Sequence, residues 1–442
     1  MSDMGEVQQQ PAVEDADADP DLILEEEEEP VDAKTLLRSY ATDLHGGRAV
    51  LEKWKKRGVA RSELMERFVQ GCSEQYEYLP ELVELFTKLF APLELLEFLE
   101  ANESPRPMVI RTNTLKTSRR VLAKALTARG VHLEPLAAWS KVGLKIFKSS
   151  VPVGATPEYL SGHYMLQSAS SFAPVIALGP KPGERILDMC SAPGGKTTYI
   201  AQLMKNKGIL VANDLKKHRL PSTIMNLARL GVRHSIVVNQ DGRAFPKTMG
   251  GFDRVLLDAP CSGLGVIAHD PSIKTTRTVP DILRTAHLQK ELLLSAIDSV
   301  NHRSSTGGVI VYSTCSISVE ENEQVVQYAL EKRKVRLVDT GLSFGKEGLL
   351  KHQEHRFDAS MKLTRRLYPH VHNMDGFYVA KFVKYDRELT AEEEEEKDVL
   401  VESVSTNGAD VTDEKKRKRS GEAKRGNDIV EKKRSKKHTK KG

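Results

Sequence analysis

Cysteine is scarce in this chain, with four residues in 442, and the four form no CxxC pair. The sequence therefore indicates neither a disulfide framework nor a metal site, and we expect free intracellular thiols and no bound metal. Long hydrophobic runs are also absent, since no stretch approaches 18 apolar residues. The start of the chain lacks the basic and apolar segments of a secretory signal, so we expect neither membrane insertion nor secretion.

The charges are unevenly distributed along the chain. Residues 1–33 contain 13 acidic residues and no Lys or Arg, whereas residues 34–390 carry 51 bases against 35 acids. Residues 391–442 begin with AEEEEE and end in KKRKR and KKRSKK runs. A basic body between charged ends favours a polyanionic partner such as RNA.

Composition and periodicity divide the chain into five parts. Residues 1–33 are too charged to pack and are expected to be a disordered acidic head. Residues 34–105 show apolar residues at helical spacing, divided by Pro92, and residues 106–175 read as a smaller α+β region. Residues 176–385 read as an α/β domain, and residues 386–442 as a disordered tail, acidic and then basic.

The α+β region begins with a strand at 105–116 and a helix that ends at Gly130. This unit carries a group of bases, which are Arg106, Arg111, Lys116, Arg119 and Arg120. One interpretation is an ordinary solvated face, and the other is a surface that contacts RNA.

The α/β domain contains five short β-rich runs separated by helical stretches. The runs are residues 184–189, 208–214, 235–241, 253–260 and 307–315. Apolar strands with helices between them predict a mostly parallel sheet covered on both faces. The alternating segment at 374–385 is expected to be an edge strand or hairpin, and Pro221 is expected to start or kink the second helix of the domain.

The segment DMCSAPGGKT, residues 188–197, runs from a predicted strand through a Gly-Gly turn into a predicted helix. Free N–H groups at a helix start favour a bound ligand, so we expect a cofactor here. A P-loop would need glycine where the chain has Cys190, and the Rossmann GxGxxG is also missing. Asp214 lies 19 residues past Gly195, where a ribose-binding acid would be placed. The pattern therefore indicates an adenosine-type cofactor without a pyrophosphate.

Four acidic residues close four successive predicted strands, namely Asp188, Asp214, Asp241 and Asp258. The carboxyl ends of such strands line the ligand crevice, although any one of these acids could instead be a helix cap or turn residue. S-adenosylmethionine fits, because its hydroxyl, amine and sulfonium groups suit acceptor-rich strand ends. Lys196 is expected to cap the loop or to offset this negative charge.

Cys261 and Cys315 follow two neighbouring predicted strands, so both thiols should face the same crevice. A buried structural cysteine is the alternative for either residue. The C5 atom of cytosine becomes nucleophilic only after a group adds to C6, and a thiolate can do this. A second group must then remove the C5 proton, while Asp258 could bind the N3/N4 edge and stabilise the developing charge.

These motifs together resemble the Nol1/Nop2/Sun family of RNA cytosine-C5 methyltransferases, over residues 60 to 385. The resemblance rests on DMCSAPGGKT (188–197), ND (213–214), DGR (241–243), DAPCSG (258–263) and STCSI (313–317). It is closest to the nucleolar branch that modifies large-subunit ribosomal RNA. It implies that residues 176–385 form a Rossmann-like, S-adenosylmethionine-dependent methyltransferase domain and that residues 106–175 bind RNA.

The resemblance also implies roles for individual residues. Cys315 would be the nucleophile, Cys261 would assist product release, and Asp258 would be the acid beside the base. The residues implied to contact S-adenosylmethionine are Cys190, Ser191, Ala192, Pro193, Gly194, Gly195, Lys196, Asp214, Asp241 and Asp258. Spacing alone does not order the two cysteines, because in DNA cytosine-C5 methyltransferases the Pro-Cys turn supplies the nucleophile.

Two serines and a proline depart from the family pattern. Many members have cysteine at the positions of Ser191 and Ser313, and neither change is expected to touch an assigned role. Pro221 stands where the family has a continuous helix.

The leading hypothesis is an enzyme that forms 5-methylcytosine in large-subunit ribosomal RNA during ribosome biogenesis. The alternative is an assembly factor that binds pre-ribosomal RNA and proteins and whose scaffold role outweighs catalysis. The basic runs at 415–419 and 432–437 read as nuclear import signals or RNA-binding arms, with a solubilising tail as the alternative. We therefore expect a nuclear, nucleolar protein.

Overall fold

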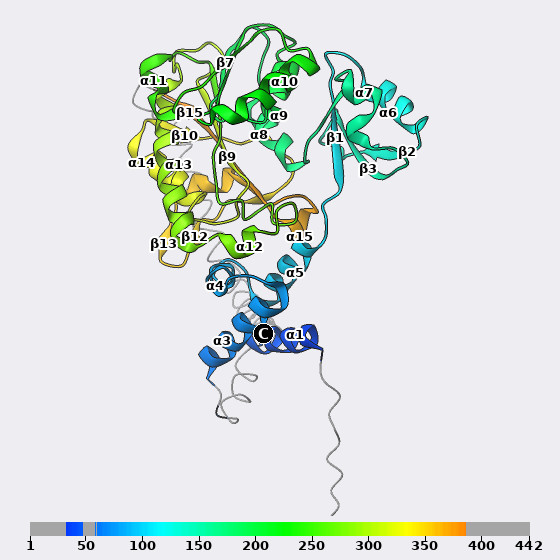
Figure 1. Cartoon of the computed structure of the whole chain (residues 1–442). Helices are drawn as coiled ribbons and strands as arrows, with labels where there is room; N and C mark the ends of the chain where they lie inside the picture. The colour runs from blue at the N-terminus through cyan, green and yellow to red at the C-terminus, as the bar shows by residue number, and fades with distance from the viewer. Residues whose placement is uncertain (1–31, 47–57, 59, 386–442) are drawn as a thin grey trace, which may run out of the picture.

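The computed structural model describes residues 32–46, 58 and 60–385. The expected acidic head, apart from its last two residues, and the expected charged tail lie outside the described residues. The described residues form three parts in Figure 1. A helical layer lies at the bottom, a small sheet at the right, and a large sheet with its helices at the top left. Among the described residues, no helix combines the length and apolar character that a membrane span requires.

The helical layer precedes both sheets in the sequence. Pro80 and Pro92 each occupy the first turn of a helix, where the missing N–H costs nothing, so the expected division at Pro92 is confirmed. The apolar faces of these helices pack together and onto Leu264, Ile267 and Tyr368 of the large domain. The helices are α1 (Ala33–His45), α3 (Arg61–Tyr76), α4 (Pro80–Thr87) and α5 (Pro92–Glu103).

The small sheet has four antiparallel strands in the order β2-β3-β1-β4. With its helices, the chain order is β-α-β-β-α-β, which is the ferredoxin-like arrangement. Its own core includes Ile110, Leu122 and Tyr164. The elements are β1 (Met108–Thr112), α6 (Arg119–Thr127), β2 (Val131–Pro135), β3 (Gly143–Ser149), α7 (Pro157–Leu160) and β4 (Tyr164–Leu166).

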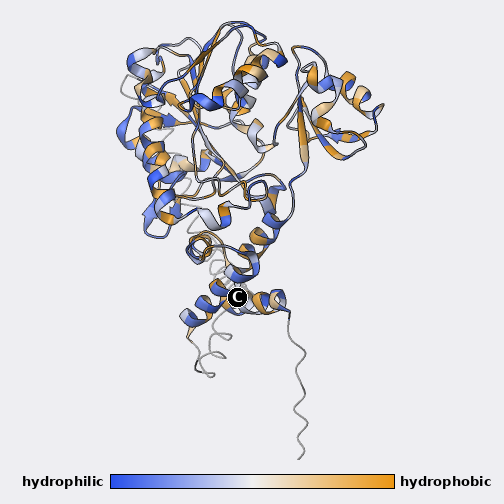
Figure 2. Cartoon of the chain, viewed as in Figure 1, coloured by the Kyte–Doolittle hydropathy of each residue, from blue (hydrophilic) through white to orange (hydrophobic). Residues whose placement is uncertain are grey.

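The large sheet contains the five expected strands, which pair in parallel in the order β7-β6-β5-β8-β9. The order reverses at β5, so the crevice that binds ligands in such sheets lies between the carboxyl ends of β5 and β8. In Figure 2 the strands of this sheet are coloured mainly as hydrophobic, whereas the outer helices carry both hydrophobic and hydrophilic residues. The strands are β5 (Arg185–Asp188), β6 (Ile209–Asn213), β7 (Ser235–Val238), β8 (Arg254–Asp258) and β9 (Val309–Thr314).

Helices cover the parallel strands as the periodicity predicted. The second helix has Pro221 in its first turn, so this proline starts the helix and does not kink it. The helices are α8 (Ala173–Leu178), α9 (Gly195–Leu203), α10 (Leu220–Leu230), α11 (Phe245–Thr248), α12 (Ile273–Thr276), α13 (Val279–Ser299), α14 (Glu323–Lys332) and α15 (Pro369–His372).

The expectation of an edge strand or hairpin at 374–385 is wrong. Strand β15 (Phe377–Lys384) lies inside the sheet, antiparallel to β9 on one side and to β14 and β10 on the other. The alternation was misleading because Phe377 to Ala380 are all buried, as in a strand covered on both faces. The sheet is therefore mixed, and its further strands are β10 (Val335–Leu337), β11 (Lys346–Glu347) and β14 (Arg365–Leu367), with a separate hairpin of β12 (Lys351–His352) and β13 (His355–Arg356).

Candidate active site

The Gly-Gly turn connects β5 to α9 at the crevice between β5 and β8. Gly194 has φ +95°, and a Cβ there would come within 3.1 Å of Thr223 Cα, so both conformation and space require glycine. The Ser191 N–H donates to the Asn213 carbonyl (2.7 Å), and Asn226 Nδ2 donates to the Pro193 carbonyl (2.9 Å). The turn is thus fastened to β6 and α10, with the first N–H groups of α9 at the crevice.

Asp214 and Asp188 accept hydrogen bonds from this turn and from the first turn of α9. Asp214 accepts from the Ala192 N–H (3.1 Å) and the Lys216 N–H (2.9 Å). Asp188 is fully buried and accepts from Thr197 Oγ1 (2.7 Å), while its Oδ1 has no hydrogen-bond partner in the described part of the chain. Burial, with smaller contributions from Asp258 and Asp214, raises the pKa of Asp188 to about 7. A buried acceptor without a partner points to a ligand with donor groups.

The raised pKa of Asp188 predicts a pH-dependent stability. Between the unfolded value near 4 and about 7, the folded state binds a proton that the unfolded state has lost, so the free energy of unfolding falls as pH rises. From pH 5.5 to 7 the loss should be roughly 2 kcal/mol. Asp188→Asn should remove most of this slope in urea unfolding of the ligand-free protein. An unchanged slope would contradict the assignment.

Asp241 sits beyond β7 and is held by a neighbouring arginine. Its carboxylate accepts from the Arg243 backbone N–H (2.9 Å) and guanidinium (2.7 Å), and Arg243 also pairs with Glu291 (2.8 Å). The Arg243 guanidinium therefore lowers the pKa of Asp241. Asp241 is ionised and oriented, but Arg243 already occupies both of its oxygens.

Asp258, at the end of β8, is held between a lysine and a serine. Lys196 Nζ lies 2.7 Å from Asp258 Oδ2, and Ser313 Oγ donates to Asp258 Oδ1 (2.7 Å). Burial alone would lower the pKa of Lys196, but Asp258 holds that pKa above its ordinary value. The expectation that Lys196 offsets negative charge is confirmed. Ser313 contacts this assigned residue because β9 pairs with β8 and brings Ser313 opposite Asp258.

The two thiols meet, as their strand positions predicted. Cys261 Sγ lies 3.1 Å from Cys315 Sγ, too far for a disulfide and close enough for a hydrogen bond. Hydrogen bonding to Cys315, together with burial, raises the pKa of Cys261 well above its ordinary value. Cys261 therefore keeps its proton at neutral pH and can donate a hydrogen bond to the Cys315 sulfur.

A buried carboxylate that the sequence did not single out fastens the two thiol-bearing loops. Glu321 Oε1 accepts from the Ser262 N–H (2.7 Å) and Gln289 Nε2 (3.2 Å), and Ser262 Oγ lies 3.2 Å from Ser316 Oγ. Gln289 also donates to the Pro260 carbonyl (2.8 Å). The only sequence signal was an acidic pair after STCSIS, which also suits a helix start.

Backbone contact between two glycines brings the start of β15 to the same place. The Gly265 N–H donates to the Cys315 carbonyl, and the Gly376 N–H donates to the Gly265 carbonyl, both at 2.8 Å. A Cβ on Gly265 would lie 2.0 Å from the Gly376 oxygen, so only glycine fits. The loops after β8 and β9 and the start of β15 are thus held as one unit.

The interpretation of the small-domain bases as an RNA-contacting or solvated face is wrong for Arg111. Arg111 is 1% exposed and donates to the Gly195 carbonyl (2.6 Å) and Thr198 Oγ1 (2.8 Å). Burial lowers its pKa to about 9. Arg111 therefore attaches β1 to the start of α9.

Three of the other bases in this group donate to backbone carbonyls. Arg106 donates to Ser104, Lys116 donates to Ser161 and Arg229, and Arg119 donates to Ser140. The fifth base, Arg120, is exposed.

Comparison with known proteins agrees with this geometry. A family model described as 16S rRNA methyltransferase RsmB/F matches residues 175–383, and one described as an RsmF/B-like ferredoxin-like domain matches residues 82–153. A 28S rRNA (cytosine(4447)-C(5))-methyltransferase of Homo sapiens is 61% identical over 335 residues, 76% of this chain and 41% of that relative. The chain spans about half the length of the eukaryotic relatives it matches.

Shorter archaeal proteins are matched over nearly their whole length. A tRNA (cytosine(49)-C(5))-methyltransferase of Pyrococcus abyssi is 37% identical over 70% of this chain and 94% of that relative. The crystal structure of NSun6 from Pyrococcus horikoshii with SFG superimposes with a TM-score of 0.62 and 27% identity, over 70% of this chain and 98% of that one. Because this chain is 37% identical to a relative that it covers over 94% of its length, and the family model matches residues 175–383, the chain belongs to the Nol1/Nop2/Sun family of RNA cytosine-C5 methyltransferases.

Proposed function

We propose that this protein methylates the C5 atom of a cytosine in large-subunit ribosomal RNA, with S-adenosylmethionine as cofactor. The observation that carries the proposal is the pair of thiols 3.1 Å apart, beside a carboxylate held by Lys196 and Ser313. A thiol pair next to an acid is what addition to cytosine C6 and later elimination require. Two relatives that are each 61% identical to this chain carry the names of 28S and 25S rRNA cytosine-C5 methyltransferases, which supports ribosomal RNA as the substrate.

The residues between β5 and β8 suit S-adenosylmethionine. The unpartnered Asp188 Oδ1 and the Asp214 carboxylate are acceptors for its amine and hydroxyl groups, and the free N–H groups at the start of α9 face the same crevice. When bound, S-adenosylmethionine supplies an electrophilic methyl group. We infer that Cys190 to Lys196, Asp214, Asp241 and Asp258 form its site.

The chain's own groups prepare the cytosine. The Cys315 sulfur forms a bond to C6, and the electron pair of the C5–C6 double bond becomes available at C5. At the N3/N4 edge of the base, Asp258 accepts a hydrogen bond from the N4 amino group. Lys196 neutralises Asp258, so the negative charge that develops on the ring is not repelled by a bare carboxylate.

Release reverses the addition. Once C5 carries the methyl group, its proton is removed, the C5–C6 double bond forms again, and the bond between C6 and sulfur breaks to return Cys315 as a thiolate. The Cys261 sulfur lies 3.1 Å from the sulfur that would hold the ring, which supports a role for Cys261 in this step. We assign Cys261 to release for that reason.

Bisulfite mapping of ribosomal RNA tests the function. Cells depleted of the protein should lose one or more 5-methylcytosines from large-subunit RNA, wild-type protein should restore them, and Cys315→Ala should not. Unchanged methylation in depleted cells would contradict the proposal. If Cys315→Ala restores growth without methylation, the assembly role outweighs catalysis.

We further propose that the protein acts in the nucleolus, where large-subunit ribosomal RNA is made. The basic runs at 415–419 and 432–437, outside the described residues, read as import signals. A chain truncated at residue 410 should lose its nucleolar signal in fluorescence imaging. Unaltered localisation would place the signal elsewhere.

A further inference from the structure

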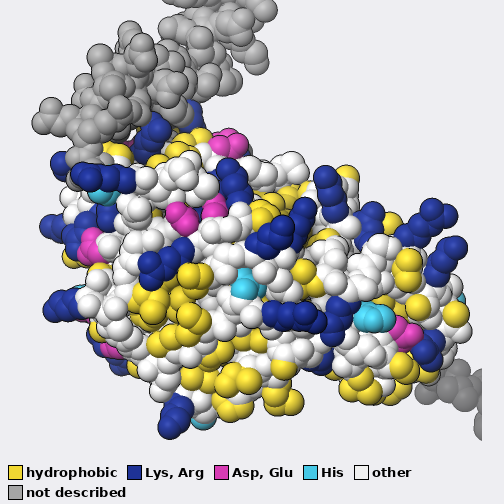
Figure 3. Space-filling view, turned by 90° about the horizontal axis from the view of Figure 1, so that it is seen from above, with side chains coloured by type: hydrophobic (Ala, Val, Ile, Leu, Met, Phe, Trp, Pro, Cys, Tyr) yellow, Lys and Arg dark blue, Asp and Glu magenta, His cyan; other side chains and the backbone are white. Residues whose placement is uncertain are grey.

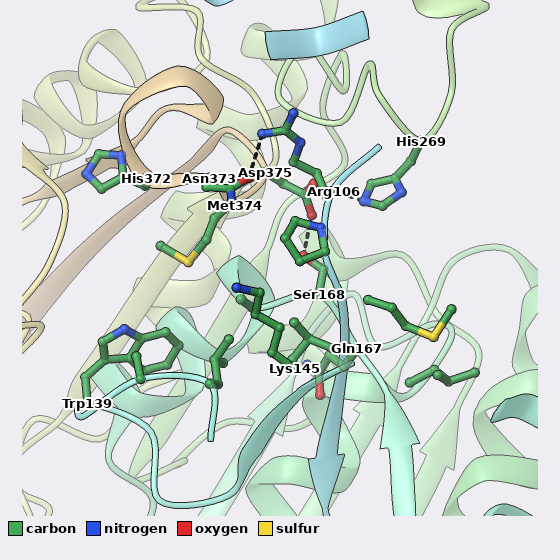
Figure 4. Close-up of a pocket in the computed structure, with 17 residues that line it drawn as sticks. Arg106, Trp139, Lys145, Gln167, Ser168, His269, His372, Asn373, Met374 and Asp375 are labelled. Carbon is green, nitrogen blue, oxygen red and sulfur yellow. Dashed lines mark hydrogen bonds and ion pairs between the residues drawn. The ribbon is translucent and has the colours of Figure 1, made fainter. Parts of the chain in front are cut away.

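A groove of about 710 Å³ separates the small sheet from the segment that leads into β15 (Figure 4). The side of the small sheet contributes Trp139, Lys145 and Gln167, which directly follows β4. The large domain contributes His269, Met374 and Asp375. We refer to it as the interdomain groove. Its volume falls within the roughly 300–1,000 Å³ of pockets that hold one small molecule, so it suits a single nucleotide and not a duplex.

Both walls of the interdomain groove connect directly to the reaction centre. On one wall, Gln167 accepts from Arg111, the residue that also holds the Gly195 carbonyl, and the Gln167 amide lies 3.7 Å from the position of a Cβ on Gly195. On the other wall, Asp375 directly precedes Gly376, which bonds to Gly265 of the Cys261 loop. The two walls of the groove therefore contact the Gly-Gly turn and the loops that carry the two thiols.

The groove offers an aromatic ring held in a fixed position. Trp139 stacks on Phe344, with ring centroids 4.3 Å apart and planes at 27°, and Phe172 packs edge-on at 6.3 Å. Figure 4 shows the indole, Met374 and the Lys145 side chain around the same space. A fixed aromatic ring in an apolar setting is a platform on which a nucleobase can stack.

Lys145 and His269 line the same groove as Trp139, and Asp375, the acid among the lining residues, is nearly buried. His269 is half exposed and lies 3.0 Å from Asp375, whose side chain is only 4% exposed and also accepts from Ser170 Oγ (3.4 Å). The hydrogen bond to Asp375 raises the pKa of His269, which increases the fraction that carries a positive charge. Lys145 Nζ lies 3.5 Å from the exposed Glu134 carboxylate and 4.6 Å from the centroid of the Phe147 ring. Lys and Arg side chains also spread over the face seen in Figure 3, which includes both domains.

From these contacts we propose that the interdomain groove binds the nucleotide next to the target cytosine in the RNA chain, with its base on Trp139 and its phosphate beside Lys145 and His269. This inference rests on the proposed function. A base that is turned out of its stack leaves its neighbours at the mouth of the crevice, where enzymes of this kind contact them. The groove is such a neighbouring site, and its charge matches a phosphate.

Tryptophan fluorescence tests binding without any chemistry. Trp139 and Trp54 are the only tryptophans, so a Trp54→Phe variant reports on Trp139 alone. A short single-stranded oligoribonucleotide centred on the cytosine mapped by bisulfite should quench this signal, while anisotropy of a labelled copy measures binding independently. Copies with an abasic site at the 5′ or the 3′ neighbour should separate the two positions, since only one should abolish quenching. Binding without quenching, or quenching that survives both abasic sites, would overturn the proposal.

Steady-state methylation provides the second readout. Trp139→Leu should raise KM for this RNA about tenfold or more, and Lys145→Gln several-fold, with smaller changes in kcat. Lys148→Gln, an exposed lysine on the same strand that does not line the groove, is the matched control and should leave KM unchanged. Equal KM values for all three variants would overturn the proposal. If the RNA quenches Trp139 but the wild-type protein does not methylate it, the proposed function is refuted and not the binding site.

Discussion

Replacing Cys261 with alanine is expected to trap the protein on its RNA as a covalent adduct. Without the Cys261 thiol, Cys315 can still add to C6, but release from C6 should become slow. The adduct should appear as a shifted band of labelled ribosomal RNA on a denaturing gel and should accumulate only with S-adenosylmethionine present. Cys315→Ala should give no adduct and no methylation.

The control for this experiment is Cys72→Ala, since Cys72 is buried in the helical layer away from both sheets. It should methylate RNA without accumulating an adduct. An adduct that forms with Cys315→Ala would reverse the roles of the two cysteines. The same outcome would make the Pro-Cys turn the nucleophile, as in the DNA enzymes.

Replacing Arg366 with methionine is expected to cost about 3–5 kcal/mol of unfolding free energy. Arg366 and Glu323 form an ion pair with side chains 1% and 0% exposed, so the substitution leaves a buried carboxylate without its partner. Arg366 also donates to the Ile317 carbonyl (2.7 Å), two residues past Cys315. Methylation should therefore fall together with stability. Urea unfolding followed by circular dichroism measures the first effect.

An exposed ion pair supplies the control for Arg366. Arg333 and Asp298 pair at 2.8 Å with side chains 36% and 37% exposed, so Arg333→Met should cost less than about 1 kcal/mol. If both substitutions cost the same, the Arg366 pair is not a stabilising link beneath the thiol loops.

The sequence predicted the five parallel strands and the proximity of the two thiols because both depend on short segments of the chain and on their order. Each strand has its own apolar run, and parallel strands present their carboxyl ends at one edge. Cys261 and Cys315 come directly after neighbouring strands, so their proximity follows from strand order alone.

The contacts that hold the site were not predictable, because they join residues far apart in the chain. Arg111 looked like a surface base until β1 was seen to pack against α9. The place of β15 between β9 and β14 depends on a pairing that no local pattern specifies. Glu321 and Arg366 sit in charged stretches typical of a surface, and only burial distinguishes them.

The apolar contact between the helical layer and the Cys261 loop also has a consequence for biosynthesis. Phe98 and Leu99 of α5 share their core with Leu264 and Ile267, roughly 160 residues later in the chain. At synthesis rates of about 5–20 residues per second, Leu264 and Ile267 are made on the order of ten seconds after α5. During that interval the helices expose an apolar face, which makes the nascent chain a natural client for a chaperone. An expression fragment that begins at residue 175 would leave the complementary surface of the thiol loop bare and prone to aggregate.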